Sequence, residues 1–163
     1  MRTFSSAAEL LAAMGETIGP GEPYRVDQDR IQAFADATDD HQWIHLDAQR
    51  AAAGPFRTRI AHGYLTLSLL PRLMRGLYRL ESVSMAVNYG LNKVRFPAPL
   101  PSGSSIRATA VISRVEEVPG GLQVVMTVSV VADGASKPCC VAESVSRLAF
   151  GAVRDSGGQP STV

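Results

Sequence analysis

Two side chains that can exchange protons stand five residues apart, at Asp40 and His45. A carboxylate can accept a proton, and an imidazole, whose ordinary pKa is about 6.5, can hold or relay one near neutral pH. Further along, Gly63 stands where a leucine-rich helix is expected to begin. Its backbone N–H would there be free to stabilise a developing negative charge. Together these groups predict acid–base chemistry on a substrate that passes through an oxyanion.

Each of these side chains also has a structural interpretation. Asp40 could merely cap the following turn, and His45 could be a half-buried histidine whose hydrogen bonds are structural. His41 and His62 could join His45 as metal ligands, but their spacings match no standard zinc pattern, and we expect no metal. Trp43 could pack against the protein or form a platform for a ligand. The functional interpretation rests on the combination, because no single residue decides it.

The composition indicates one cytoplasmic globular domain. The chain has 163 residues, enough for one core, and we expect a single domain over 1–153 with a disordered tail over 154–163. A net charge of +1 gives no reason to expect nucleic acid or a membrane as a partner. No segment resembles a membrane span or a signal peptide. The adjacent Cys139 and Cys140 are expected to be reduced strand residues.

The first half of the chain has helical periodicity. A short amphipathic helix is expected over 5–14 with a serine cap, followed by a short strand over 24–26. Asp27 is a natural N-cap for a helix that carries the chain to Asp40. From His62 to about Leu77 leucines recur every fourth residue, which predicts a largely buried helix. Pro71 predicts a kink or a break in that helix.

The second half alternates with a period of two. Four strands are expected, over 84–96, 106–112, 124–130 and 140–148, with hairpin signals at 119–121 and 133–134. Four long strands after one buried helix predict an α+β fold, in which a curved antiparallel sheet wraps around that helix.

Four segments resemble the MaoC-like hydratase/dehydratase family, and within it the nodulation-protein-N-like branch of (R)-specific enoyl-CoA hydratases. They are Asp40–Asp47, Ala51–Phe56, Ile60–Leu65 and Asn88–Pro97. The resemblance covers roughly residues 21–150. It implies a hot-dog fold, a bent antiparallel sheet around a long central helix, and a homodimer formed by two such sheets.

The resemblance also implies roles for individual residues. Asp40 and His45 match the catalytic aspartate and histidine, and Gly63 matches the glycine whose N–H polarises the thioester carbonyl. Ser68 lies near a position where the family often has a serine that supports the site. Many members have Asn-Pro between the catalytic pair, whereas this chain has Gln42 and Trp43, so Gln42 is a candidate for contact with the substrate.

The implied reaction is the (R)-specific hydration of trans-2-enoyl thioesters to 3-hydroxyacyl thioesters, and the reverse dehydration. No cofactor is expected, since coenzyme A or acyl carrier protein belongs to the substrate. Lys93 and Arg95 could contact the phosphates of coenzyme A, as could four other basic residues, Arg57, Arg59, Arg72 and Arg75, or these side chains could form a solvated face.

Two other functions remain possible on the same fold: an acyl-CoA thioesterase and a non-catalytic acyl-binding module. A thioesterase usually needs a carboxylate on or beside the central helix, but the segment from His62 to Leu77 contains neither Asp nor Glu. A binding module has no need for an acid and a base placed together. Both observations favour the hydratase.

Overall fold

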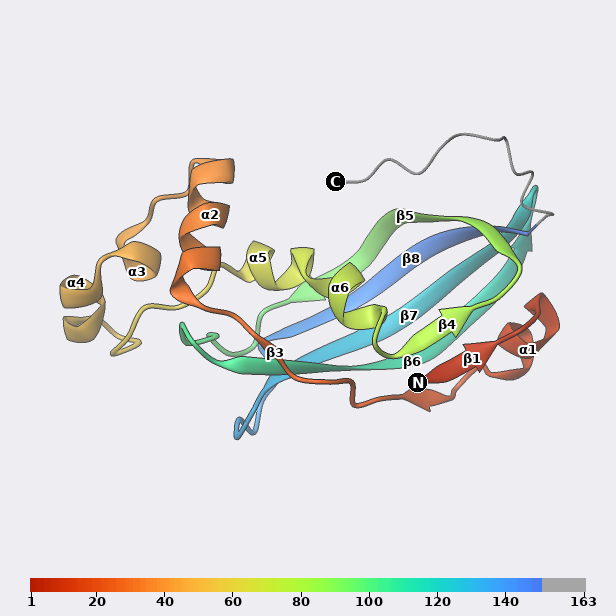
Figure 1. Ribbon diagram of the computed structural model, residues 1–163, viewed down its shortest axis with the longest axis horizontal. Coiled ribbons are helices and arrows are strands. Elements are labelled where there is room, and N and C mark those ends of the chain that lie inside the picture. Colours follow the sequence, from red (N-terminus) through yellow and green to blue (C-terminus); the bar gives the residue numbers. More distant parts are fainter. Residues whose placement is uncertain (151–163) are drawn as a thin grey trace, which may run out of the picture.

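A curved antiparallel sheet with helices across one face forms the body of the protein in the computed structural model (Figure 1). The structure describes residues 1–150; the tail predicted to be disordered, 154–163, lies outside them. The sheet contains β2 (Thr17–Ile18), β3 (Tyr24–Arg25), β5 (Val83–Arg95), β6 (Ser105–Val118), β7 (Gly121–Ala132) and β8 (Cys140–Phe150). Its main order is β2-β6-β7-β8-β5, and β3 also pairs with β6. The four predicted long strands and the α+β hot-dog fold are confirmed.

Within residues 1–150 six helices accompany the sheet: α1 (Ala7–Ala12), α2 (Gln28–Thr38), α3 (Trp43–Leu46), α4 (Ala48–Ala53), α5 (Gly63–Ser68) and α6 (Leu70–Met74). Figure 1 shows α2, α3 and α4 grouped at one end of the molecule, while α5 and α6 lie across the sheet. A small parallel pair, β1 (Arg2–Phe4) and β4 (Tyr78–Leu80), closes the other end. None of the helices in residues 1–150 is long and apolar enough to cross a membrane.

The central helical segment is shorter than the predicted 62–77 and is divided in two. It consists of α5 and α6, which meet at Leu69. Pro71 is the cause: it has no N–H for the helix ladder, and its ring restricts the preceding turn. The helical part then ends at Met74, because the chain turns at Gly76 and Leu77 and enters β4. The predicted break is confirmed, and the predicted C-terminal boundary is wrong.

The core lies between the two central helices and the concave face of the sheet. The leucines predicted to be buried are buried: Leu65, Leu69, Leu70, Leu73 and Leu77. They meet alternate residues of β6 and β7, among them Ile112 and Val128, which are fully buried. Burying such side chains supplies most of the free energy of folding, at about 1.5–3 kcal/mol each. The core thereby fixes the position at which α5 begins.

Strand β5 is an unprotected edge of the sheet in the single chain. Among the described residues it pairs with β8 alone, and nearly all of its 13 residues are exposed. Four of the exposed residues are large and apolar: Met85, Val87, Tyr89 and Leu91. A long apolar edge strand is a template for pairing with another chain. In Figure 1 the C-terminal end of β5 runs towards α5.

Candidate active site

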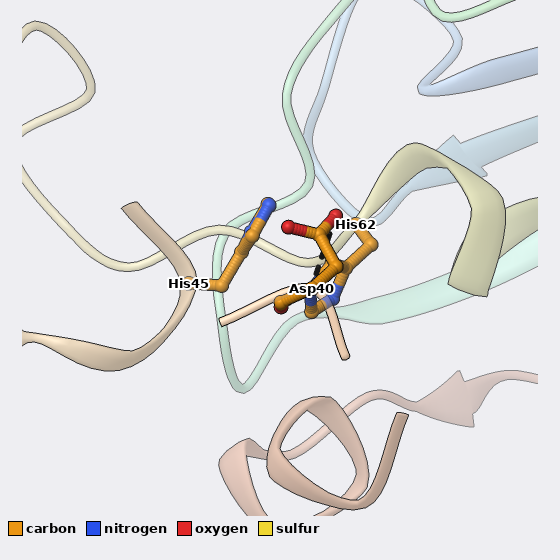
Figure 2. Close-up of side chains that lie close together, drawn as sticks. All are labelled: Asp40, His45 and His62. Carbon is orange, nitrogen blue, oxygen red and sulfur yellow. Dashed lines mark hydrogen bonds and ion pairs between the residues drawn. The ribbon is translucent and has the colours of Figure 1, made fainter. Parts of the chain in front are cut away.

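Asp40, His45 and His62 come from three separate structural elements and lie close together (Figure 2). The Asp27 carboxylate caps α2 by accepting the Arg30 N–H at 3.0 Å, as predicted. At the other end of α2 the backbone of Asp39 is left-handed, with φ of 57°, and this turns the chain into the loop that carries Asp40. His45 lies on α3, and His62 is the N-cap residue of α5.

Asp40 and His45 lie close enough together to bind one water molecule between them. One oxygen of Asp40 and one nitrogen of each imidazole lie within 4.8 Å of one another. Two acceptors that bind the same water are separated by about 4.5 Å, since each hydrogen bond is about 2.8 Å long. The Asp40 side chain is 52% exposed, whereas His45 is 6% exposed. The site is therefore buried on the side of His45 and accessible to a substrate on the side of Asp40.

The hydrogen bonds of His45 determine which of its nitrogens faces the site. Nδ1 lies 2.7 Å from the carbonyl oxygen of Ile60. A carbonyl only accepts, so Nδ1 carries the hydrogen, and in the neutral ring Nε2 keeps a lone pair. Gln28 donates to the His45 carbonyl oxygen at 2.9 Å and so holds α3 in place. Neither partner was identifiable from the sequence, because both contacts join distant segments.

The environment of His45 favours its neutral form. Burial lowers the pKa of His45, and the neighbouring His62 ring lowers it further. The hydrogen bond to Ile60 and the negative charge of Asp40 act in the opposite direction, but the net pKa stays below the ordinary value of 6.5. At neutral pH Nε2 is therefore an acceptor, which suits a general base.

His62 is a member of the site that the sequence suggested only as a metal ligand. Its ring stacks on His45 with centroids 3.7 Å apart and an interplanar angle of 27°. Imidazoles bind metals through lone pairs that lie in the plane of the ring. Stacked rings direct those lone pairs side by side instead of at a common point, so this cluster would have to rearrange to hold an ion. His41, the other suggested ligand, points away and pairs with Asp36 at 2.9 Å.

Gly63 is the first residue of α5, as the helical pattern predicted. Within residues 1–150 no hydrogen bond of its N–H is recorded, as expected for the first turn of a helix. A Cβ atom at this position would lie 2.9 Å from the ring of Phe96, at the end of β5. A side chain at position 63 would therefore displace Phe96. This packing requirement for glycine was not foreseen.

The remaining predicted residues lie around the site without converging on it. Gln42 is exposed at the N-terminus of α3, and Ser68 is exposed on α5 with its hydroxyl bound to the Tyr64 carbonyl. Lys93 and Arg95 are exposed on β5, and Arg95 donates to a neighbouring backbone carbonyl. Their roles towards the substrate stay predictions.

Trp43 is a packing residue. Its indole lies under the Arg50 guanidinium at 4.6 Å and is so close to Gly54 that a Cβ there would be 2.9 Å away. Cys139 and Cys140 are buried, and burial raises the pKa of each thiol to about 11. Both thiols are therefore protonated at neutral pH and unsuited to nucleophilic chemistry.

A cavity of about 760 Å³ flanks α5 and α6 on the side of β5. Ser68, Pro71 and Asn88 are among its lining residues, but Asp40, His45 and Gly63 are not. The catalytic candidates are therefore placed by their mutual geometry and not by this cavity. The cavity begins on the same helix that Gly63 opens.

Comparisons with known proteins identify the family of this chain. The model of the MaoC-like domain matches residues 9–134. A 3-hydroxyacyl-thioester dehydratase Z of Mycobacterium tuberculosis is 53% identical over 148 residues, which cover 90% of this chain and 98% of the relative. A nodulation protein N of Rhizobium leguminosarum bv. viciae is 38% identical over 149 residues, 89% of this chain and 92% of the relative.

Solved structures share the fold. The unliganded R-hydratase of Pseudomonas aeruginosa superposes with a TM-score of 0.68 at 23% identity, covering 85% of this chain and 83% of that one. An (R)-hydratase from A. caviae gives a TM-score of 0.60 at 22% identity, over 80% and 96% of the two chains. The resemblance read from the Asp40–Asp47 and Ile60–Leu65 segments is thus confirmed, and the chain belongs to the MaoC-like dehydratase family.

Proposed function

We propose that the protein catalyses the (R)-specific hydration of trans-2-enoyl-CoA to 3-hydroxyacyl-CoA, and the reverse dehydration. The observation that carries the proposal is the Asp40 oxygen and the His45 nitrogen within 4.8 Å of each other, beside an exposed opening. The M. tuberculosis relative, whose name specifies dehydration of 3-hydroxyacyl thioesters, supports the reaction class. The (R) configuration rests on the resemblance to (R)-specific hydratases, and chiral separation of the product tests it.

Water is activated between the two side chains. His45 Nε2 and the Asp40 carboxylate both accept hydrogen bonds, so one water can donate one hydrogen to each. This orients a lone pair of the water oxygen towards the substrate. The oxygen bonds to the β-carbon while one of the two acceptors takes a proton, and that proton then goes to the α-carbon. Water is added across the double bond, and no other reactant is consumed.

The electrons of the double bond move onto the thioester oxygen during the attack. The Gly63 N–H is the proposed donor to this oxygen, because it is unpaired and begins α5 next to the catalytic pair. Removing one such donor typically costs about 3 kcal/mol of transition-state stabilisation. The Phe96 ring, which packs against Gly63, limits where the thioester can approach.

The active form is proposed to be a homodimer. In a symmetric dimer the β5 strands of two copies would pair and form one continuous sheet, which covers the apolar edge. Tyr89 and Leu91, 58% and 46% exposed in the single chain, would then be buried against the second copy.

Thioester hydrolysis is the alternative reaction. The helices α5 and α6 carry no carboxylate. The carboxylate of the candidate site belongs to Asp40, on the loop before α3. Incubation with crotonyl-CoA separates the reactions, because hydration removes the absorbance of the conjugated thioester without releasing free thiol. Release of coenzyme A thiol would support the thioesterase, and no reaction would support the binding module.

Substitution of the catalytic pair tests the mechanism. We expect Asp40→Asn and His45→Gln each to lower kcat for crotonyl-CoA hydration at least about a hundredfold, since each removes a proton acceptor. His41→Gln is the matched control, because His41 neighbours the pair in sequence but contacts Asp36. Near-normal turnover in both catalytic variants would contradict the mechanism.

The pH dependence tests the state of His45. As a base, His45 must be unprotonated, and its lowered pKa keeps it so until the pH falls below 6.5. We therefore expect the rate to be constant from pH 8 down to about 6.5 and to decline only below that. A rate that rises as the pH is lowered through this region would mean that the imidazolium is the active form.

Charges on β5 test the dimer. Sedimentation at micromolar concentration should give twice the chain mass of 17.4 kDa for the unmodified protein. Tyr89→Lys together with Leu91→Lys should yield monomers, because symmetry brings like charges together at the edge. Met14→Lys, an equally exposed apolar position away from β5, should remain dimeric. A monomeric unmodified protein would refute the proposal.

A further inference from the structure

His62 is a buried residue at the centre of the site to which the mechanism assigns no step. It is 2% exposed, and its ring lies between His45, at 3.7 Å between centroids, and Phe34 of α2, at 5.1 Å. It also immediately precedes Gly63, and its carbonyl accepts the Thr66 N–H that starts α5. His62 therefore contacts or adjoins every part of the proposed machinery.

One nitrogen of His62 holds the backbone of Asp40. Nε2 lies 3.0 Å from the Asp40 carbonyl oxygen, which can only accept, so Nε2–H is the donor. Within residues 1–150 the Asp40 carboxylate makes no recorded hydrogen bond, and its nearest ionic partner is the same Nε2 at 3.9 Å. Asp40 lies in an exposed loop, so this main-chain bond is what ties it to the buried part of the site.

The face of His62 supports His45. The bond from His45 Nδ1 to Ile60 leaves the ring free to tilt about that contact, and the stacked His62 ring covers one of its faces. Through these two contacts His62 holds the loop of Asp40 beside the ring of His45 (Figure 2).

Packing alone does not account for an imidazole at this position. Nδ1 of His62 is buried without a hydrogen-bond partner among the described residues. An apolar ring would fill the same space without burying an unpaired acceptor. What the imidazole adds is the Nε2–H donor to Asp40.

We propose that His62 is a positioning residue, which holds Asp40 through its Nε2–H and His45 through its ring, without touching the substrate. The proposal rests on the hydratase function for its kinetic consequence. Misplacing a catalytic group by about 1 Å can cost about a hundredfold in rate. Loss of the Nε2–H donor should therefore lower kcat and leave KM nearly unchanged.

A pair of amide substitutions isolates the donor. The side-chain N–H of His62→Gln can reach the place of Nε2, whereas the shorter side chain of His62→Asn ends near the place of Nδ1 and leaves the Asp40 carbonyl without a donor. Both variants lose the ring, so their difference reports the donor alone. For crotonyl-CoA we expect kcat of the Asn variant to be at least about tenfold below that of the Gln variant, with KM values within about threefold.

Thr66→Val is the control for disturbance of the core. Thr66 is as buried as His62 and donates from its hydroxyl to the His62 carbonyl, but among the described residues no side-chain hydrogen bond joins it to Asp40 or His45. Its kcat should stay within about threefold of the unmodified protein. Equal kcat values in the Gln and Asn variants would overturn the proposed donor.

A measurement without turnover separates this proposal from the proposed function. The 13C resonance of the Asp40 carbonyl should move when its hydrogen bond is lost, in the Asn variant but not in the Gln variant. If the unmodified protein fails to hydrate crotonyl-CoA, the hydratase function is wrong, and the resonance still decides the role of His62. An unmoved resonance in the Asn variant would overturn the positioning role in either case.

Discussion

The hydrogen bond from His45 Nδ1 to the Ile60 carbonyl is the interaction on which the site depends. It fixes the tautomer of the ring, so that Nε2 presents a lone pair to the opening where Asp40 lies. The bond also joins α3 to the strand-like segment before α5, because Ile60 N–H in return donates to Ile44 O. One pair of contacts thereby couples the proposed base to the helix that begins at Gly63.

The scaffold makes this coupling rigid. Leucines of α5 and α6 pack into the concave face of β6 and β7, and the N-terminus of α5 is thereby held at the end of the sheet. Short helices α2 and α3 then bring Asp40 and His45 over that end, with Gln28 linking them through the His45 carbonyl. The chemistry is carried by loops and helix ends, while the sheet and leucine core hold them in register.

The sequence predicted the parts of the molecule that have a local signature. Alternation revealed the four long strands, leucine spacing revealed the central helices, and Pro71 revealed their interruption. The family segments pointed to Asp40, His45 and Gly63. The features that the sequence did not predict depend on contacts between distant residues. They are the pairing of β5 with β8, the hydrogen bond between His45 and the Ile60 carbonyl, the stacking of His62 on His45, and the packing of Phe96 on Gly63. Helices as short as α3 and α4 have too few turns for a periodic pattern.

The proposed mechanism places one water-derived oxygen between Asp40 and His45 Nε2 while the thioester oxygen faces Gly63. A crystal structure of the Asp40→Asn variant with bound 3-hydroxybutyryl-CoA tests it most directly, because the product hydroxyl marks the place of that water. We expect the hydroxyl about 2.6–3.2 Å from His45 Nε2, and the thioester oxygen at a similar distance from the Gly63 nitrogen. A hydroxyl directed away from both residue 40 and His45 would contradict it.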